Sequence, residues 1–231
     1  MNKIKKLIAF TLAETLIVMG IIGVVAALTI PNVNKNTSNM EKVTRFKKIY
    51  AELNEALDRA TAVYGPIETW YQNIPESAAA KKFTDRLTEF MKVNKSYSCL
   101  SDETFDVDEG GSSCVIFANG ASIIYCFNCD YFFIDIDGPN KGKNELGIDR
   151  FFLGGYDDGY HDFIHGITAS SVSPSEFRND ATYCFKYKGM CGQWILDNGN
   201  MDYLNADRDG KCKNDTSKVL GYGEGKVQSC K

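Results

Sequence analysis

The sequence predicts an α+β protein in which a long N-terminal α-helix, membrane-spanning in its first half and amphipathic in its second, packs on an antiparallel β-sheet head. Three observations lead to this fold class. Fifteen of the twenty-one residues from 10 to 30 are apolar, a helical stripe of apolar residues follows between 43 and 64, and two strand-like segments flank Asn119-Gly120. Helices and strands that are segregated along the chain in this way are typical of α+β domains.

Composition narrows the classes of function. The chain has 231 residues, 26 basic and 30 acidic side chains, a formal net charge of -4 and a mean hydropathy of -0.26. This is globular composition, so a disordered chain and a polytopic membrane protein are excluded. The chain has no excess of basic residues that would indicate nucleic-acid binding. With only two histidines, few catalytic or metal sites based on histidine are available.

The apolar run from 10 to 30 is long enough, as a helix of about 30 Å, to cross a bilayer core. Lys3, Lys5 and Lys6 precede it, which predicts a cytoplasmic N-terminus and a head on the other side of the membrane. A secretory signal peptide cut near Ala27 is one interpretation. Glu14 argues against it, because a carboxylate in such a segment costs roughly 3 kcal/mol at the bilayer centre and is normally functional.

The segment from Ala9-Phe10-Thr11-Leu12-Ala13-Glu14 to Pro31 resembles the class III signal of type IV pilins and type II secretion pseudopilins. The resemblance implies that a prepilin peptidase cuts between Ala9 and Phe10, where the family usually has Gly before the cut, and methylates the amine of Phe10. It also implies a pilin-like fold with a leader at 1–9, a transmembrane and assembly helix at 10–30, an amphipathic continuation at 31–64 and a head at 65–231.

Glu14 is expected to act in assembly. It is the only charged side chain between residues 10 and 30, and in a filament core of low dielectric each charge needs a partner. The new amine of Phe10 of an incoming subunit can pair with Glu14 of its neighbour. This pairing would fix the register between subunits.

The head is predicted from periodicity. An apolar stripe ends near Gly65-Pro66, and a second helix is expected from Ser77 to Val93 with Ser77 as its cap. Segments 114–118 and 121–125 flank Asn119-Gly120, the strongest short hairpin signal, and a third strand is expected at 131–136. Further short strands are expected at the segments 151–153, 181–186 and 193–196.

All eight cysteines follow the apolar run, in the part of the chain that the predicted topology places outside the cytoplasm. Structural disulfides are therefore favoured over zinc ligands and free thiols. Short loops favour Cys184 with Cys191 and Cys212 with Cys230, although many other connectivities exist. The candidates are Cys99, Cys114, Cys126, Cys129, Cys184, Cys191, Cys212 and Cys230.

A loop rich in oxygen side chains and glycine follows the third predicted strand and resembles the calcium loop of some pseudopilins. Calcium takes about six to eight oxygen ligands on flexible backbone, and the candidates here are Asp135, Asp137, Asn140, Asn144 and Asp149. The loop is not an EF-hand, because Leu146 stands at the twelfth position. A polar turn without any ion is the alternative. The segment 205–210 is interpreted as a turn, and an ion site is the second, less favoured interpretation.

His161 and His165 have the spacing of a zinc metallopeptidase helix, but the glycines around them favour a loop. We therefore expect no enzyme but a structural subunit of a type IV pilus-like or type II secretion filament, with other pilin or pseudopilin subunits, a prepilin peptidase and the bacterial inner membrane as partners. The expected cofactor is none, or calcium. The alternative is a membrane-anchored extracytoplasmic binding domain that forms no filament.

Overall fold

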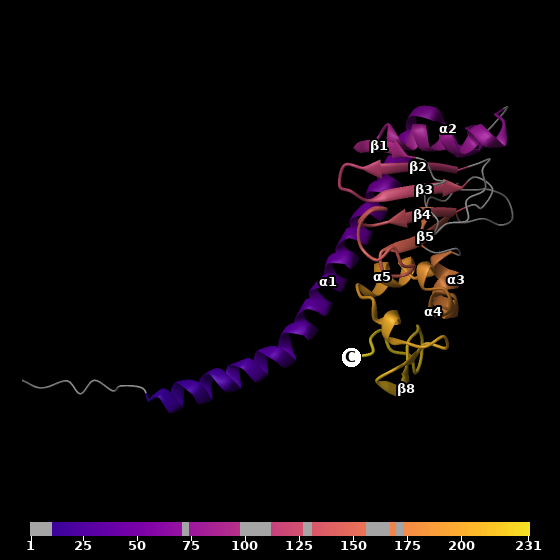
Figure 1. Ribbon diagram of the computed structural model, residues 1–231. Helices are drawn as coiled ribbons and strands as arrows, with labels where there is room; N and C mark the ends of the chain where they lie inside the picture. The colour runs from indigo at the N-terminus through magenta and orange to yellow at the C-terminus, as the bar shows by residue number, and fades with distance from the viewer. Residues whose placement is uncertain (1–10, 71–73, 98–111, 127–130, 156–166, 170–172) are drawn as a thin grey trace, which may run out of the picture. The chain divides into compact units, whose positions relative to one another are not determined.

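The structure is a computed structural model that describes residues 11–70, 74–97, 112–126, 131–155, 167–169 and 173–231 (Figure 1). Contacts between residues divide the chain into two compact units, Met1–Met40 and Glu41–Lys231. The helix α1 (Leu12–Tyr64) runs without interruption through Pro31 and belongs to both units.

The first half of α1 differs from the predicted architecture, in which it spans a membrane. Among the described residues, no helix combines the length and the apolar character that crossing a membrane requires. The predicted fold class is therefore wrong, because it required the first half of the N-terminal helix to span a membrane. The predicted single pass through the inner membrane, with the N-terminus in the cytoplasm and the head outside it, is contradicted by the same finding.

The second unit is built around one antiparallel sheet of six strands in the order of the sequence. The register pairs each strand only with its neighbours along the chain, so the sheet is a simple meander. Its strands are β1 (Val93–Tyr97), β2 (Ser112–Phe117), β3 (Ser122–Cys126), β4 (Tyr131–Asp135), β5 (Arg150–Gly155) and β6 (Ile167–Thr168).

The hairpin predicted at Asn119-Gly120 is confirmed between β2 and β3. Gly120 has a φ of +91°, which a residue without a side chain adopts at little cost. Asn119 Oδ1 accepts a hydrogen bond from the backbone N–H of Ala121 at 3.0 Å, so the turn satisfies its own polar groups. The strands predicted at 131–136 and 151–153 correspond to β4 and β5.

Within the second unit, one face of α1 is buried in the core. Its residues are Val43, Phe46, Ile49, Leu53, Ala56, Leu57 and Ala60. The ring of Phe46 lies 4.8 Å from the ring of Phe151 on β5. Tyr50 donates its hydroxyl hydrogen to the carbonyl of Ile167 at 2.8 Å, and the N–H of Ile167 donates to Asn54 Oδ1 at 3.2 Å. The edge strand β6 is thus held by side chains of α1.

The helix α2 (Glu76–Thr88) packs on the sheet through Phe83, which contacts the rings of Tyr125 and Phe132 at centroid distances of 4.6 and 5.4 Å. It ends five residues before the predicted end, because the chain must turn into β1 at Val93. Pro75 stands at the N-cap position, so the prediction that Ser77 caps this helix is wrong.

The strands predicted at 181–186 and 193–196 are wrong, since the structure has helices there. The short helices there bury Phe185 and, on the other side of the Cys184–Cys191 bridge, Trp194 and Ile195. Gly199, with a φ of +63°, ends the last of them. The C-terminal part comprises α3 (Pro174–Asn179), α4 (Thr182–Lys186), α5 (Gly192–Asn198), β7 (Lys211–Cys212) and β8 (Asp215–Val219). Short 3-10 helices are η1 (Ile67–Thr69), η4 (Lys188–Met190) and η5 (Asp202–Asn205).

Candidate functional site

The first turn of α1 is closed by a reciprocal pair of side chains, Thr11 and Glu14. The backbone N–H and the hydroxyl of Thr11 both donate to Glu14 Oε2 at 2.8 Å, and the N–H of Glu14 donates back to Thr11 Oγ1 at 3.2 Å. Thr11 is therefore the N-cap of a capping box, with Glu14 at its third helical position. These two hydrogen bonds from Thr11, the backbone one first, lower the pKa of Glu14 below its ordinary value.

Sequence reasoning assigned Glu14 only to pairing between subunits and missed this local partner. The signal was present, since a Thr three residues before a Glu at the start of an apolar run is the pattern of a capping box. Among the described residues, no donor reaches Glu14 Oε1, so this oxygen retains acceptor capacity. The expected cleavage residues Ala9 and Phe10 lie outside the described residues.

Large apolar side chains cover α1 on all sides after the capping box. Each is at least half exposed, and the exposed fractions of Leu12 and Met19 reach 79% and 71%. The set comprises Leu12, Leu16, Ile17, Val18, Met19, Ile21, Ile22, Val24 and Val25. A helix that is apolar all round is normally buried, so this surface has the character of an interface.

A second candidate site lies in the loop between β4 and β5. Asp149 has no exposed surface, and its carboxylate accepts hydrogen bonds from the N–H groups of Lys143, Asn144 and Glu145 at 2.7 to 3.1 Å. Three backbone donors around one buried carboxylate fix the course of the loop.

Asp135 takes a structural role in the same loop. Arg150 Nε donates to Asp135 Oδ2 at 3.0 Å, and both side chains are almost fully buried. The N–H groups of Gly138 and Asp137 donate to Asp135 Oδ1. Burial raises the pKa of Asp135 to about 6, against the lowering effect of the Arg150 hydrogen bond. With both oxygens engaged, Asp135 is not positioned as a metal ligand.

Asp137 and Asn144 present oxygen atoms that the loop itself does not use. Asp137 Oδ1 and Asn144 Oδ1 are buried and have no hydrogen-bond partner. A side chain added at Gly142 would place its Cβ 2.5 Å from Asp137 Oδ2 and 2.5 Å from Asp149 Oδ2, so these two oxygens are no more than about 5 Å apart. The loop therefore brings together Asp137, Asn144 and Asp149 of the predicted ligands, whereas Asn140 is exposed.

The part of the chain that the structure describes holds no group of three or more His, Cys, Asp or Glu side chains placed to bind a metal ion. A cation in the loop would therefore draw on the amide oxygen of Asn144 and on backbone or water oxygens, as calcium often does. In the segment 205–210, the N–H groups of Asp209 and Lys211 donate to Asp207 Oδ1 at 2.9 and 2.8 Å, which is a polar turn. His161 and His165 lie outside the described residues.

Two predicted disulfides are confirmed, Cys184–Cys191 and Cys212–Cys230. Cys114 is also disulfide-bonded. Cys99 and Cys129 lie outside the described residues, and of Cys126 only the backbone is described. Among the described cysteines none is free, so no thiol there is a nucleophile or a metal ligand.

Comparison with known proteins gives one match. The sequence profile of a family described as a family of unknown function (DUF6613) matches residues 32–222. No curated protein matches the chain, and no solved structure matches it.

Proposed function

The chain belongs to the DUF6613 family of unknown function, and we propose that it is a structural subunit that assembles with other subunits through the first part of α1, as pilins and pseudopilins do. The observation that carries the proposal is the exposed apolar surface of α1 from Leu12 to Val25. Burying one such side chain fully contributes about 1.5–3 kcal/mol. Association of several helices would bury many of them at once.

Glu14 supports the same function. It is the only charged residue between 11 and 34, and it stands at the start of the exposed apolar surface. Its Oε2 is used within the helix, whereas Oε1 can accept a hydrogen bond from a cation on a neighbouring subunit. Cleavage before Phe10 would generate such a cation, the new amine of the next subunit. The carboxylate would then set the register of an otherwise uniform apolar contact.

The test uses the full chain coexpressed with a prepilin peptidase. N-terminal sequencing is expected to give a chain that starts at Phe10, and sedimentation with electron microscopy is expected to show polymers. Glu14→Gln should lower the polymerised fraction at least tenfold, because it removes the charge but keeps an acceptor for Thr11. Glu41→Gln is the matched control, since Glu41 is a helical glutamate paired with Arg45 on the exposed surface.

Thr11→Val separates the two roles of Glu14. This variant removes the hydroxyl of the capping box and keeps the charge of Glu14, so polymers should still form. If Thr11→Val and Glu14→Gln impair assembly equally, Glu14 serves only to start the helix. A chain that begins at Met1 and stays monomeric would overturn the proposed function.

We also propose that the loop between β4 and β5 binds calcium, with Asp137 and Asn144 as the side chains that would hold the ion, since both oxygens of Asp149 already accept backbone hydrogen bonds. Two buried oxygens without hydrogen-bond partners support this assignment, because such atoms are costly unless a donor or a cation satisfies them. Asp137 Oδ2 and Asp149 Oδ2 also lie no more than about 5 Å apart, and a divalent cation would offset the repulsion between the two carboxylates. A bound ion would fix the loop in place, which is a structural role.

Calcium binding is tested by thermal unfolding of the full chain. At a free calcium concentration about one hundred times the dissociation constant, the gain is about 2.7 kcal/mol, which corresponds to roughly 5–10 °C in Tm for a chain of this size. Asp137→Asn should abolish most of the shift, and Asp209→Asn, in the other polar turn, should leave it unchanged. An equal Tm with calcium and with chelator would refute the site.

A further inference from the structure

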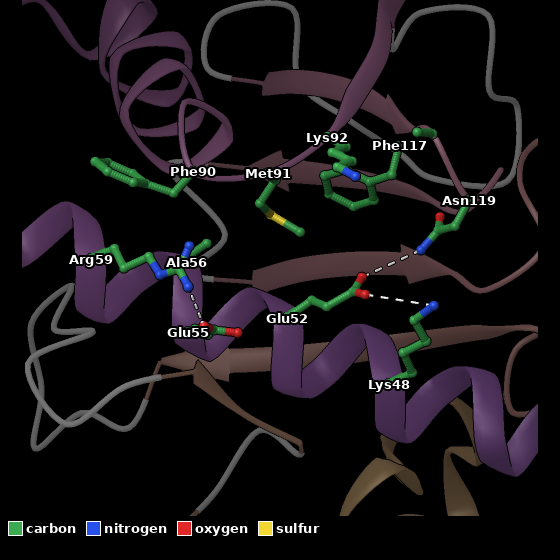
Figure 2. Close-up of a pocket in the computed structure, with 11 residues that line it drawn as sticks. Lys48, Glu52, Glu55, Ala56, Arg59, Phe90, Met91, Lys92, Phe117 and Asn119 are labelled. Carbon is green, nitrogen blue, oxygen red and sulfur yellow. Dashed lines mark hydrogen bonds and ion pairs between the residues drawn. The ribbon is translucent and has the colours of Figure 1, made fainter.

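A groove of about 340 Å³ lies beside the part of α1 that belongs to the second unit (Figure 2). One wall is a stripe of α1, and the other comes from the segment after α2 and from the turn between β2 and β3. The N–H of Ala118 donates to the carbonyl of Lys92 at 2.7 Å, which joins the two segments of the second wall. The groove is therefore formed by three connected parts of one unit.

The floor of the groove is apolar. Ala56 and Phe117 have exposed fractions of only 2%, and Phe90 and Met91 are partly buried against the core. Figure 2 shows Phe90, Met91 and Phe117 on the side of the groove opposite α1. A bound molecule would thus meet aromatic, thioether and methyl surface, which favours an apolar body.

The rim carries charges that are already paired along α1. Lys48 Nζ lies 3.8 Å from Glu52 Oε1, and Arg59 Nη2 lies 2.5 Å from Glu55 Oε1. Asn119 Nδ2 also donates to Glu52 Oε2 at 3.5 Å, as Figure 2 shows with dashed lines. Both carboxylates of the rim therefore have partners within the protein.

Lys92 differs from the other charged residues of the groove. It is exposed on the wall opposite α1, and no described carboxylate pairs with it in the structure. Three cations, Lys48, Arg59 and Lys92, line the groove against two carboxylates, which leaves one positive charge in excess. The excess stands out because the whole chain has a net charge of -4.

We propose that this groove binds a small amphiphilic carboxylate, of the size and chemistry of a medium-chain fatty acid. The carboxylate pairs with the ammonium group of Lys92, and the apolar body lies on Phe90, Met91 and Phe117. A cationic ligand is disfavoured, since it would have to displace Lys48 or Arg59 from the carboxylates of the rim. The volume is at the lower end of the range for small-molecule sites, which fits a single short chain and not a helix of another protein.

The test is equilibrium dialysis of radiolabelled octanoate against the full chain, a measurement that is valid whether the chain is monomeric or assembled. We expect saturable binding of octanoate, and no saturable binding of octylamine, which has the same chain and the opposite charge. Lys92→Gln should weaken octanoate binding about fivefold, and Lys92→Arg should keep it within about twofold, because an exposed ion pair contributes up to about 1 kcal/mol.

Lys81→Gln is the matched control, because Lys81 is exposed on α2, pairs with Asp85 and does not line the groove. It should bind octanoate like the unchanged chain. Octanoate adsorbed on the apolar surface of α1 would be insensitive to Lys92, so equal binding by Lys92→Gln and the unchanged chain overturns the proposal. Equal binding of octylamine and octanoate overturns it as well. The proposal is independent of filament assembly, since none of its residues precedes Lys48.

Discussion

At the scale of single residues, two buried carboxylates, those of Asp149 and Asp202, are held by backbone N–H groups. Asp149 accepts three such bonds in the loop after β4. Asp202, almost fully buried, accepts from the N–H of Cys230 at 3.1 Å and from the hydroxyl of Ser229. Each carboxylate therefore shapes a segment of irregular chain that has few apolar residues of its own.

The roles of these carboxylates could be predicted only in part. The density of Asp and Asn from residue 135 to 149 identified the loop from the sequence. Whether a given carboxylate in the loop serves a structural role or remains free for an ion depends on which backbone N–H groups donate to it and on whether Arg150 does. Composition does not show the positions of these donors. The disulfides Cys184–Cys191 and Cys212–Cys230 could be predicted because each closes a short segment of chain.

Lys188 provides a prediction about pH. Its Nζ donates to the carbonyl of Tyr203 at 2.6 Å, and burial, followed by the nearby charge of Lys213, lowers its pKa from 10.5 to about 8. Between these two values the unfolded chain binds more protons than the folded one, so the free energy of unfolding should rise with pH above about 8. Urea denaturation between pH 8 and the onset of tyrosine ionisation near about pH 10 measures this slope.

Lys188→Met should remove the rise, because the variant has no amine to titrate. Lys186→Met, at an exposed position on α4, is the control and should keep it. The assignment fails if the Lys188→Met chain shows the same slope as the unchanged chain.

At the scale of elements, the sequence predicted best where one local rule acts alone. The turn at Asn119-Gly120 needs a positive φ, and Asn followed by Gly is the residue pair that adopts such a φ most readily in hairpin turns. The end of α2 and the helices α4 and α5 could not be predicted, because their short apolar segments fit a strand and a buried turn of helix equally well. Their choice depends on tertiary packing, as with Trp194, which lies against Phe185 and Tyr222 at 5.8 and 5.5 Å.

The turn between β2 and β3 and the loop after β4 contact each other through Gly138. A Cβ at this position would lie 2.1 Å from the carbonyl oxygen of Gly120, and φ is +94°. Gly138→Ala should lower the free energy of unfolding by about 3 kcal/mol, which combines the cost of positive φ with overpacking. Chemical denaturation measures the loss.

Gly223→Ala is the matched control for backbone strain. Gly223 has a φ of +88° but no atom within 4 Å of an added Cβ, so the change should cost only about 1–2 kcal/mol. Equal losses in the two variants would show that the contact between turn and loop does not constrain the fold.

At the scale of the whole molecule, the second unit is closed by its last residues. Cys230 is bonded to Cys212, and its carbonyl accepts from Asn214 Nδ2 at 2.7 Å. Asn200 Nδ2 donates to the carbonyl of Gln228 at 3.0 Å. These bonds fasten a C-terminal stretch that the sequence left without any predicted element, because it has little apolar periodicity.

Removing the bridge should therefore destabilise the second unit. The double change Cys212→Ala and Cys230→Ala opens a segment with a sequence separation of 18 and should lower the free energy of unfolding by about 3 kcal/mol. The pair Cys184→Ala and Cys191→Ala, with a separation of 7, should cost somewhat less, about 2.5 kcal/mol. Tryptophan fluorescence during denaturation reports both, and a reversed order would contradict this account.

The capping box at Thr11 and Glu14 also bears on the order of events in the proposed assembly. Nucleation is the slow and unfavourable step of helix formation, because several residues must be fixed before the first hydrogen bond forms. A box made from the chain's own Thr11 and Glu14 favours that first turn in a solitary subunit. In the proposed assembly, the apolar surface would then be preorganised before a partner arrives, and less conformational entropy would be lost at the encounter.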